Sequence, residues 1–96
     1  MKTVYISDVI VRKDIKSNVT LLGWISSKRV SKKYMFLDLV DSTGSIQIVC
    51  NIKQFHPKLY KAEQSVKVTG QIYQNNSNNT IELHASSLEI LGDVNK

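Results

Sequence analysis

The sequence predicts an all-β fold, in which five short strands form a small barrel and one short helix lies between the third strand and the fourth. Short segments of alternating polar and apolar residues are separated by turn sequences, a pattern typical of strands with one buried face. Only residues 55–64 clearly break this alternation. A length of 96 residues with 42% hydrophobic residues suits one small domain. We therefore predict a single domain over residues 1–96.

The first three strands are predicted from residue 18 onward. Residues 18–28 ("NVTLLGWISSK") are apolar and β-branched, and the glycine at their centre indicates a bulge or a sharp bend. Residues 26–33 ("SSKRVSKK") are polar and basic, which predicts a loop. Tyr34–Asp41 and Ser45–Asn51 alternate on either side of the turn sequence "DSTG". These two strands therefore form a hairpin.

Residues 55–64 ("FHPKLYKAEQ") predict the short helix. Pro57 suits a first helical position, and Leu59, Tyr60 and Ala62 would cover one side of the helix.

Two further strands complete the predicted fold. Residues 65–74 return to alternation, the polar sequence "NNSNN" predicts a turn over residues 75–79, and Thr80–Leu91 predicts the last strand. This order of elements is the layout of an OB-fold, a partly open Greek-key barrel. OB-folds bind ligands on strands 2 and 3, between the loops that join strands 1 and 2 and strands 4 and 5. In this chain those loops are the basic segment and "NNSNN".

The predicted hairpin separates its side chains into two sets. The buried set is Met35, Leu37, Leu39, Ile46, Ile48 and Cys50. The outward set is Tyr34, Phe36, Asp38, Gln47 and Val49. An exposed aromatic ring can stack on a base for about 1 to 3 kcal/mol, and a glutamine amide can pair with the edge of a base such as uracil. The outward set therefore predicts a surface for single-stranded nucleic acid.

Positive charge supports the same prediction. The chain has a formal charge of +5 and a pI of about 9.4, which favours polyanionic partners. Lys28, Arg29, Lys32 and Lys33 lie within six residues and have no acidic neighbour. Such a cluster alone is also typical of a solvated loop, but here it adjoins Phe36.

Other classes of site are not supported by the sequence. The single cysteine, Cys50, excludes an internal disulfide and a cysteine-rich metal site, and the two histidines lie too far apart for a ligand motif. Asp38, Asp41 and Glu82 show no paired-carboxylate or nucleophile arrangement, so we predict a non-catalytic chain without a cofactor. Charges recur along the N-terminal segment, so we expect neither a membrane helix nor a secretory signal, and a cytoplasmic location.

Residues 19–51 ("VTLLGWISSKRVSKKYMFLDLVDSTGSIQIVCN") resemble the N-terminal anticodon-binding domain of class II aminoacyl-tRNA synthetases. The likeness is to the aspartate and asparagine enzymes, with the lysine enzyme a near relative. It consists of a Gly-Trp-Val/Ile bend, a basic loop, a Phe-Leu/Ile-Asp strand, an Asp-x-x-Gly turn and a Val/Ile-Gln-Val/Ile strand. "SVKVTGQI" and "IELHASSLEIL" resemble the fourth and fifth strands of the same domain.

The resemblance implies a role for several residues. Phe36 would stack on the central anticodon base, a uridine, and Gln47 would hydrogen-bond to it. Arg29 matches the arginine of the basic loop that contacts the anticodon, and Glu82 matches the acid near the first anticodon base. Trp24 is expected to pack rather than to contact RNA. The full set of predicted nucleic-acid-binding residues is Lys28, Arg29, Lys32, Lys33, Tyr34, Phe36, Gln47 and Glu82.

The chain ends at "GDVNK", before any catalytic segment of a synthetase. It also has no glycine-rich loop that could hold a phosphate. The resemblance therefore implies either a domain cut from a full synthetase or a free-standing relative, and the abrupt end favours the cut domain. Two other functions remain open at this point. One is sequence-tolerant binding of single-stranded DNA or RNA, and the other is a protein-interaction module that docks through Tyr34 and Phe36.

Overall fold

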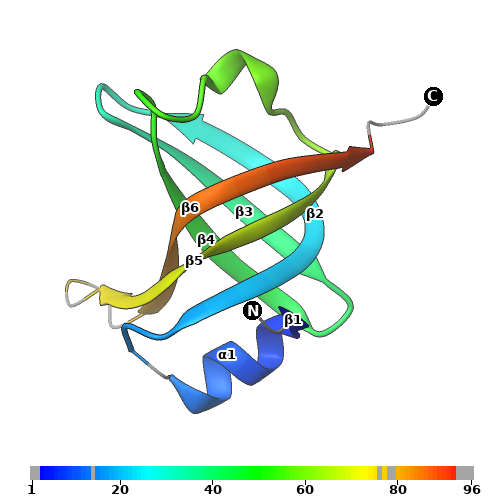
Figure 1. Ribbon diagram of the computed structural model, residues 1–96, viewed down its shortest axis with the longest axis vertical. Coiled ribbons are helices and arrows are strands. Elements are labelled where there is room, and N and C mark those ends of the chain that lie inside the picture. The colour runs from blue at the N-terminus through cyan, green and yellow to red at the C-terminus, as the bar shows by residue number, and fades with distance from the viewer. Residues whose placement is uncertain (1–2, 14, 76, 78–79, 93–96) are drawn as a thin grey trace.

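The computed structural model describes residues 3–13, 15–75, 77 and 80–92, and Figure 1 shows their arrangement. The elements in chain order are β1 (Thr3–Val4), α1 (Ile6–Arg12), β2 (Asn18–Val30), β3 (Tyr34–Asp41), β4 (Gly44–Asn51), the 3₁₀ helix η1 (Pro57–Leu59), β5 (Ser65–Asn75) and β6 (Thr80–Gly92).

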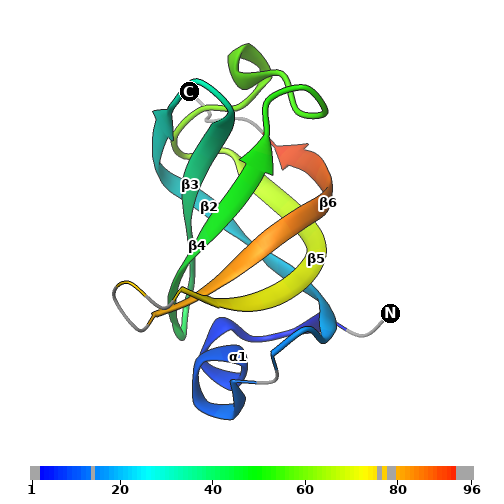
Figure 2. The same cartoon turned by 90° about the vertical axis from the view of Figure 1, so that its left-hand side faces the viewer.

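The strands form one sheet that closes on itself. Their order is β1-β2-β3-β4-β6-β5, and β5 pairs back onto β2. The pairs β1–β2 and β4–β6 are parallel, whereas β2–β3, β3–β4, β5–β6 and β2–β5 are antiparallel. The predicted all-β barrel, with its helical segment between the third and fourth long strands, is confirmed. Figure 2 shows β3, β4 and β6 side by side on one wall of the barrel.

Strand β2 closes the barrel because it pairs with two neighbours. Its first half pairs with β5 and its second half with β3, and Trp24 is aligned with both partners. Gly23 lies just before this point, and a Cβ atom there would collide with the carbonyl oxygen of Val40. The glycine is therefore required by a close approach between strands. The bulge lies further along, between Ile25 and Ser27.

The prediction of a loop over residues 26–33 is wrong for most of its length. Strand β2 continues to Val30, and Arg29 is aligned with Phe36 on β3. Only residues 31–33 connect the two strands. Pairing with β3 satisfies the backbone hydrogen bonds of this polar segment. Its side chains are largely exposed on both sides of the strand, so the sequence shows no alternating pattern there.

The sequence prediction missed the N-terminal elements β1 and α1. Helix α1 covers one end of the barrel, below the strands in Figures 1 and 2, and buries Ile6 and Val9 in the core. The carboxylate of Asp41 accepts a hydrogen bond from the backbone N–H of Ile6 at 2.9 Å and also bonds to Thr43 and Gly44. Burial raises the pKa of Asp41, but these hydrogen bonds outweigh it, so the net effect is a lowered pKa. The β3–β4 turn thus fixes the start of the helix.

The helix predicted over residues 55–64 is shorter than expected. Only Pro57–Leu59 forms a 3₁₀ helix, and at Tyr60 the backbone is already extended. Tyr60 is buried and meets Phe55 edge-on, with ring centroids 6.5 Å apart, whereas Leu59 is 59% exposed. Packing of Tyr60 into the core requires the chain to leave the helical conformation.

The six residues predicted to be buried in the hairpin are all in the core. Cys50 is among them, as predicted, and burial raises the pKa of its thiol to about 12. Val49 was predicted to face outward but is only 8% exposed, because β6 lies beside β4 and aligns His84 with it.

Two classes of feature are absent from the residues that the structure describes. No helix there is long and apolar enough to cross a membrane. Nor does any group of three His, Cys, Asp or Glu side chains in these residues have an arrangement that could hold a metal ion.

Candidate nucleic-acid interface

Four neighbouring strands, β2, β3, β4 and β6, together place five side chains on one outer surface of the barrel. Arg29 on β2 is aligned with Phe36 on β3, and Gln47 on β4 is aligned with Glu82 on β6. His84 follows Glu82 by two residues and is therefore on the same side of its strand. We call these five side chains the central face. The strand register thus brings four of the predicted residues, Arg29, Phe36, Gln47 and Glu82, onto one side of neighbouring strands. Figure 2 shows these strands on one wall of the barrel.

Phe36 provides a half-buried aromatic ring at one end of the central face. The guanidinium of Arg29 lies over this ring, with its central carbon 4.4 Å from the centroid, and the Tyr34 ring lies 6.2 Å away at a tilt of 47°. Arginine planes and aromatic rings both stack on bases. Arg29 is exposed, so its guanidinium is open to solvent as well as to the ring.

Gln47 belongs to a hydrogen-bonded group at the other end of the central face. Its Nε2 donates to Oε2 of Glu82 at 3.2 Å, and Nε2 of His84 donates to the other oxygen of Glu82 at 2.9 Å. Asn75 contributes a longer bond, 3.5 Å, to Oε2 of Glu82. The imidazole of His84 stacks on Tyr73, with centroids 4.1 Å apart and planes 26° apart. The amide of Gln47 is thus held by a carboxylate that is itself held by a histidine.

Sequence reasoning missed the contributions of Tyr73 and His84. Alternation along β6 could have placed His84 beside Glu82, since residues two apart in a strand face the same side. The position of Tyr73 can be predicted only from the register between β5 and β6, which aligns it with Glu82. No pattern within a single strand carries that register.

Asp38 lies next to Gln47 across the β3–β4 pair. Its carboxylate accepts a hydrogen bond from the hydroxyl of Ser27 at 2.7 Å. Both Asp38 and Gln47 also line a groove between the central face and the end of α1, together with Ile10, Lys13, Ser45, Ile46, Thr80 and Ile81. The central face therefore continues into a concave surface toward α1.

Lys28 does not belong to the interface predicted for it. It is aligned with Leu37, whose side chain is in the core, and is thus on the opposite side of β2 from Arg29. Its ammonium donates to the backbone carbonyls of Pro57 and Tyr60 at 2.9 and 2.8 Å. Lys28 therefore ties β2 to the 3₁₀ helix and its flank, on the side of β2 opposite Arg29.

Lys32 and Lys33 occupy the turn between β2 and β3, next to Tyr34. All three side chains are exposed, and they line a groove together with Asn51, Ile52 and Lys53. This basic turn, which we define as Lys32 and Lys33, thus lies at the rim of the central face, close to Phe36.

Trp24 differs from its prediction as a packing residue, because it is 45% exposed on β2. Strand β2 pairs there with β5 as well as β3, and in the strand order neither β4 nor β6 is its direct neighbour. Leu22, two residues earlier, is similarly exposed.

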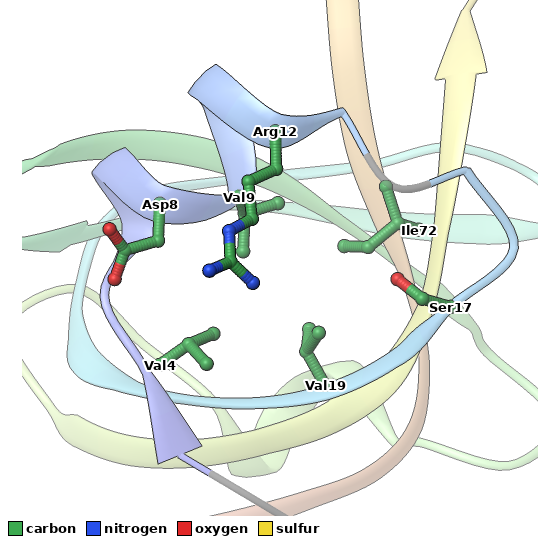
Figure 3. A pocket seen from close by; sticks show the side chains of 7 residues that line it. All are labelled: Val4, Asp8, Val9, Arg12, Ser17, Val19 and Ile72. Atoms are coloured by element: carbon green, nitrogen blue, oxygen red, sulfur yellow. The ribbon is translucent and has the colours of Figure 1, made fainter.

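A small pocket lies between α1, β2 and β5, away from the central face (Figure 3). Val4, Val9, Val19 and Ile72 line it with apolar groups, and Arg12 extends into the opening. Its volume of about 40 Å³ is far below the roughly 300 Å³ or more that is typical of small-molecule sites.

Comparison with known proteins defines the class. A family model described as an OB-fold nucleic acid binding domain matches residues 19–91. The chain therefore belongs to this family, and the predicted OB-fold is confirmed. The chain is also similar to parts of aspartate and asparagine tRNA ligases.

The chain is 33% identical, over an alignment 109 positions long, to the aspartate–tRNA(Asp/Asn) ligase of Cyanothece, a match that covers 100% of the chain and 18% of the ligase. It is 36% identical over 78 residues to the asparaginyl-tRNA synthetase of Mus musculus, covering 78% of the chain and 16% of that protein. The crystal structure of asparaginyl-tRNA synthetase from Pyrococcus horikoshii complexed with asparaginyl-adenylate matches with a TM-score of 0.84 and 28% identity, over 98% of the chain and 23% of that protein. The chain thus spans about a fifth of the length of these relatives.

Proposed function

We propose that this chain binds the anticodon loop of a tRNA and that Phe36 and Gln47 recognise its central base, a uridine. The observation that carries the proposal is the position of these two side chains on paired strands of one wall, in a domain similar to parts of aspartate and asparagine tRNA ligases. Phe36 supplies a stacking surface, and Gln47 supplies an amide that pairs with the edge of the base.

Positive charges attract the RNA without selecting its sequence. Arg29, Lys32 and Lys33 lie beside Phe36 and neutralise phosphates, a contribution that weakens as salt rises. Glu82 cannot share this role, because a carboxylate repels phosphate. It faces donors instead, which here include Gln47 and His84.

The proposed domain has no chemistry of its own and needs no cofactor. In the native protein it would be joined to the catalytic domain of an aminoacyl-tRNA ligase specific for aspartate or asparagine, acting in the cytoplasm. Its contribution would be affinity and selectivity for the cognate tRNA.

A titration with two RNA stem-loops that differ only at the central anticodon base, U or C, tests the proposal. We expect the U loop to bind more tightly, by about tenfold, because the C loop leaves polar groups unpaired. Gln47→Ala should reduce this preference. Equal affinities for the two loops in the unmodified chain would contradict base recognition and favour a sequence-tolerant binder, and absence of binding would favour a protein-interaction module.

A further inference from the structure

The side-chain amide of Gln47 has only one orientation compatible with its neighbour. A carboxylate accepts hydrogen bonds and donates none, so the end of the amide that faces Glu82 must be the nitrogen. The contact joins Nε2 of Gln47 to Oε2 of Glu82 at 3.2 Å. The oxygen of the amide therefore faces away from Glu82, whatever base is bound.

Glu82 is in turn held in place. One oxygen bonds to Nε2 of His84 at 2.9 Å, and the other bonds to Gln47 and, at 3.5 Å, to Asn75. The side chain of Glu82 is only 13% exposed, and that of His84 is 41% exposed. His84 is fixed by its stack on Tyr73. Rotation of the carboxylate away from Gln47 would break several of these contacts together.

A fixed amide distinguishes uracil from cytosine, whereas a freely turning amide does not. Uracil presents a donor at N3 and an acceptor at O4, and cytosine presents an acceptor at N3 and a donor at its exocyclic amine. The two patterns are reversed at the same two positions. An amide has one donating end and one accepting end, so it can match either base by turning over. Held in one orientation, it matches one base and leaves the other with two groups unpaired.

We propose that Glu82 and His84 are positioning residues, which hold the amide of Gln47 in one orientation and thereby exclude cytosine where uracil is recognised. This inference rests on the proposed function, because it explains the selectivity of the same site. Glu82 acts through Gln47, and His84 acts through Glu82.

The test compares the affinity ratio for the U and C stem-loops in variants of the 96-residue chain. In Glu82→Gln the new side chain is equal in size but can accept as well as donate, so the amide of Gln47 is free to turn. We expect the U/C ratio to fall about tenfold, mainly through tighter binding of the C loop. Loss of a negative charge also strengthens binding of both loops, but this effect cancels in the ratio.

Glu89→Gln provides a matched control, because it removes the same charge from an exposed position on the same strand. It should leave the U/C ratio unchanged. A second pair of variants tests His84: His84→Leu removes the N–H donor to Glu82, whereas His84→Gln keeps one. We expect the ratio to fall in His84→Leu and to be retained to a greater extent in His84→Gln. A thermal melt of each variant checks that it is folded.

The outcomes separate this inference from the proposed function. If Gln47→Ala abolishes the preference for U but Glu82→Gln keeps the full ratio, the positioning role is overturned and base recognition by Gln47 stands. A lower ratio in Glu82→Gln caused only by weaker U binding would also overturn the positioning role, since it indicates a general loss of structure. If the unmodified chain binds both loops equally, or if Gln47→Ala leaves the ratio unchanged, both proposals fail.

Discussion

The central face and the basic turn lie side by side but are built in opposite ways. On the central face the side chains constrain one another: Arg29 lies over Phe36, and Glu82 bonds to both Gln47 and His84. The two lysines of the basic turn are exposed side chains at the end of a hairpin. Base recognition requires fixed donors and acceptors, whereas attraction of phosphates requires only charge. The two regions are therefore suited to selectivity and to affinity, respectively.

The largest effect on binding is expected from Phe36→Ala on the central face. Loss of the stacking surface should weaken binding of both stem-loops by about 1 to 3 kcal/mol, because every base has a face that stacks. Fluorescence anisotropy with labelled RNA measures this change. Trp24→Ala removes an exposed aromatic ring elsewhere on the barrel and should leave the affinity unchanged. An equal loss in both variants would show that stacking is not localised on the central face.

Gln47→Ala should separate the two regions most clearly. We expect it to reduce the preference for U over C by about 1.4 kcal/mol, or tenfold, while the salt dependence of binding stays as in the unmodified chain. The measurement is a pair of titrations at several salt concentrations. Gln54→Ala is the control, because Gln54 is an exposed glutamine whose amide bonds to the backbone of Ser86. A change in the salt dependence of binding in Gln47→Ala would contradict the proposal that the central face provides selectivity and the basic turn provides attraction of phosphates.

Lys28→Met should affect stability rather than RNA binding. The substitution keeps the long apolar stem but removes the ammonium that bonds to two backbone carbonyls, so we expect the free energy of unfolding to fall by about 1 kcal/mol. Urea denaturation measures this. Lys58→Met removes a charge from an exposed position nearby and should have a smaller effect. If Lys28→Met instead weakens RNA binding much more than Lys58→Met does, Lys28 belongs with the basic turn after all.

The smallest effect is expected from the basic turn. Replacing Lys32 and Lys33 together with alanine should weaken binding of the U and C loops equally, by about 0.5 kcal/mol, because both are exposed charges in salt solution. The slope of log affinity against log salt should become shallower by about 1.4, for two phosphate contacts on a single strand. Lys67→Ala, an exposed lysine on β5, serves as control. A change in the U/C ratio would mean that the turn also takes part in base recognition.

Features set by the residue pattern within one strand were predicted from the sequence, whereas features set by pairing between strands were not. Alternation within one strand placed Phe36 and Gln47 on the outward side of the hairpin, and the core below them followed correctly. Alternation could not separate Lys28 from Arg29, because both are basic and only the pairing with β3 determines which one faces outward. The prediction from charge alone therefore placed Lys28 in the interface, whereas in the structure Lys28 bonds to the 3₁₀ helix.

The contacts that the sequence could not supply join residues on different strands. Tyr73 meets His84 through the register of β5 and β6, and Gln47 meets Glu82 through a parallel pairing of β4 with β6. Helix α1 was missed because its seven residues bury only Ile6 and Val9, too few for a clear helical period. These features depend on tertiary contacts, which local patterns do not record.

NMR chemical-shift mapping would locate the RNA on the barrel. Backbone amides of the ¹⁵N-labelled chain would be followed while an anticodon stem-loop with a central U is added. We expect the largest shifts on the central face, at Arg29, Phe36, Gln47, Glu82 and His84, and smaller shifts in the basic turn. Largest shifts around Leu22 and Trp24, with the central face unchanged, would contradict this expectation.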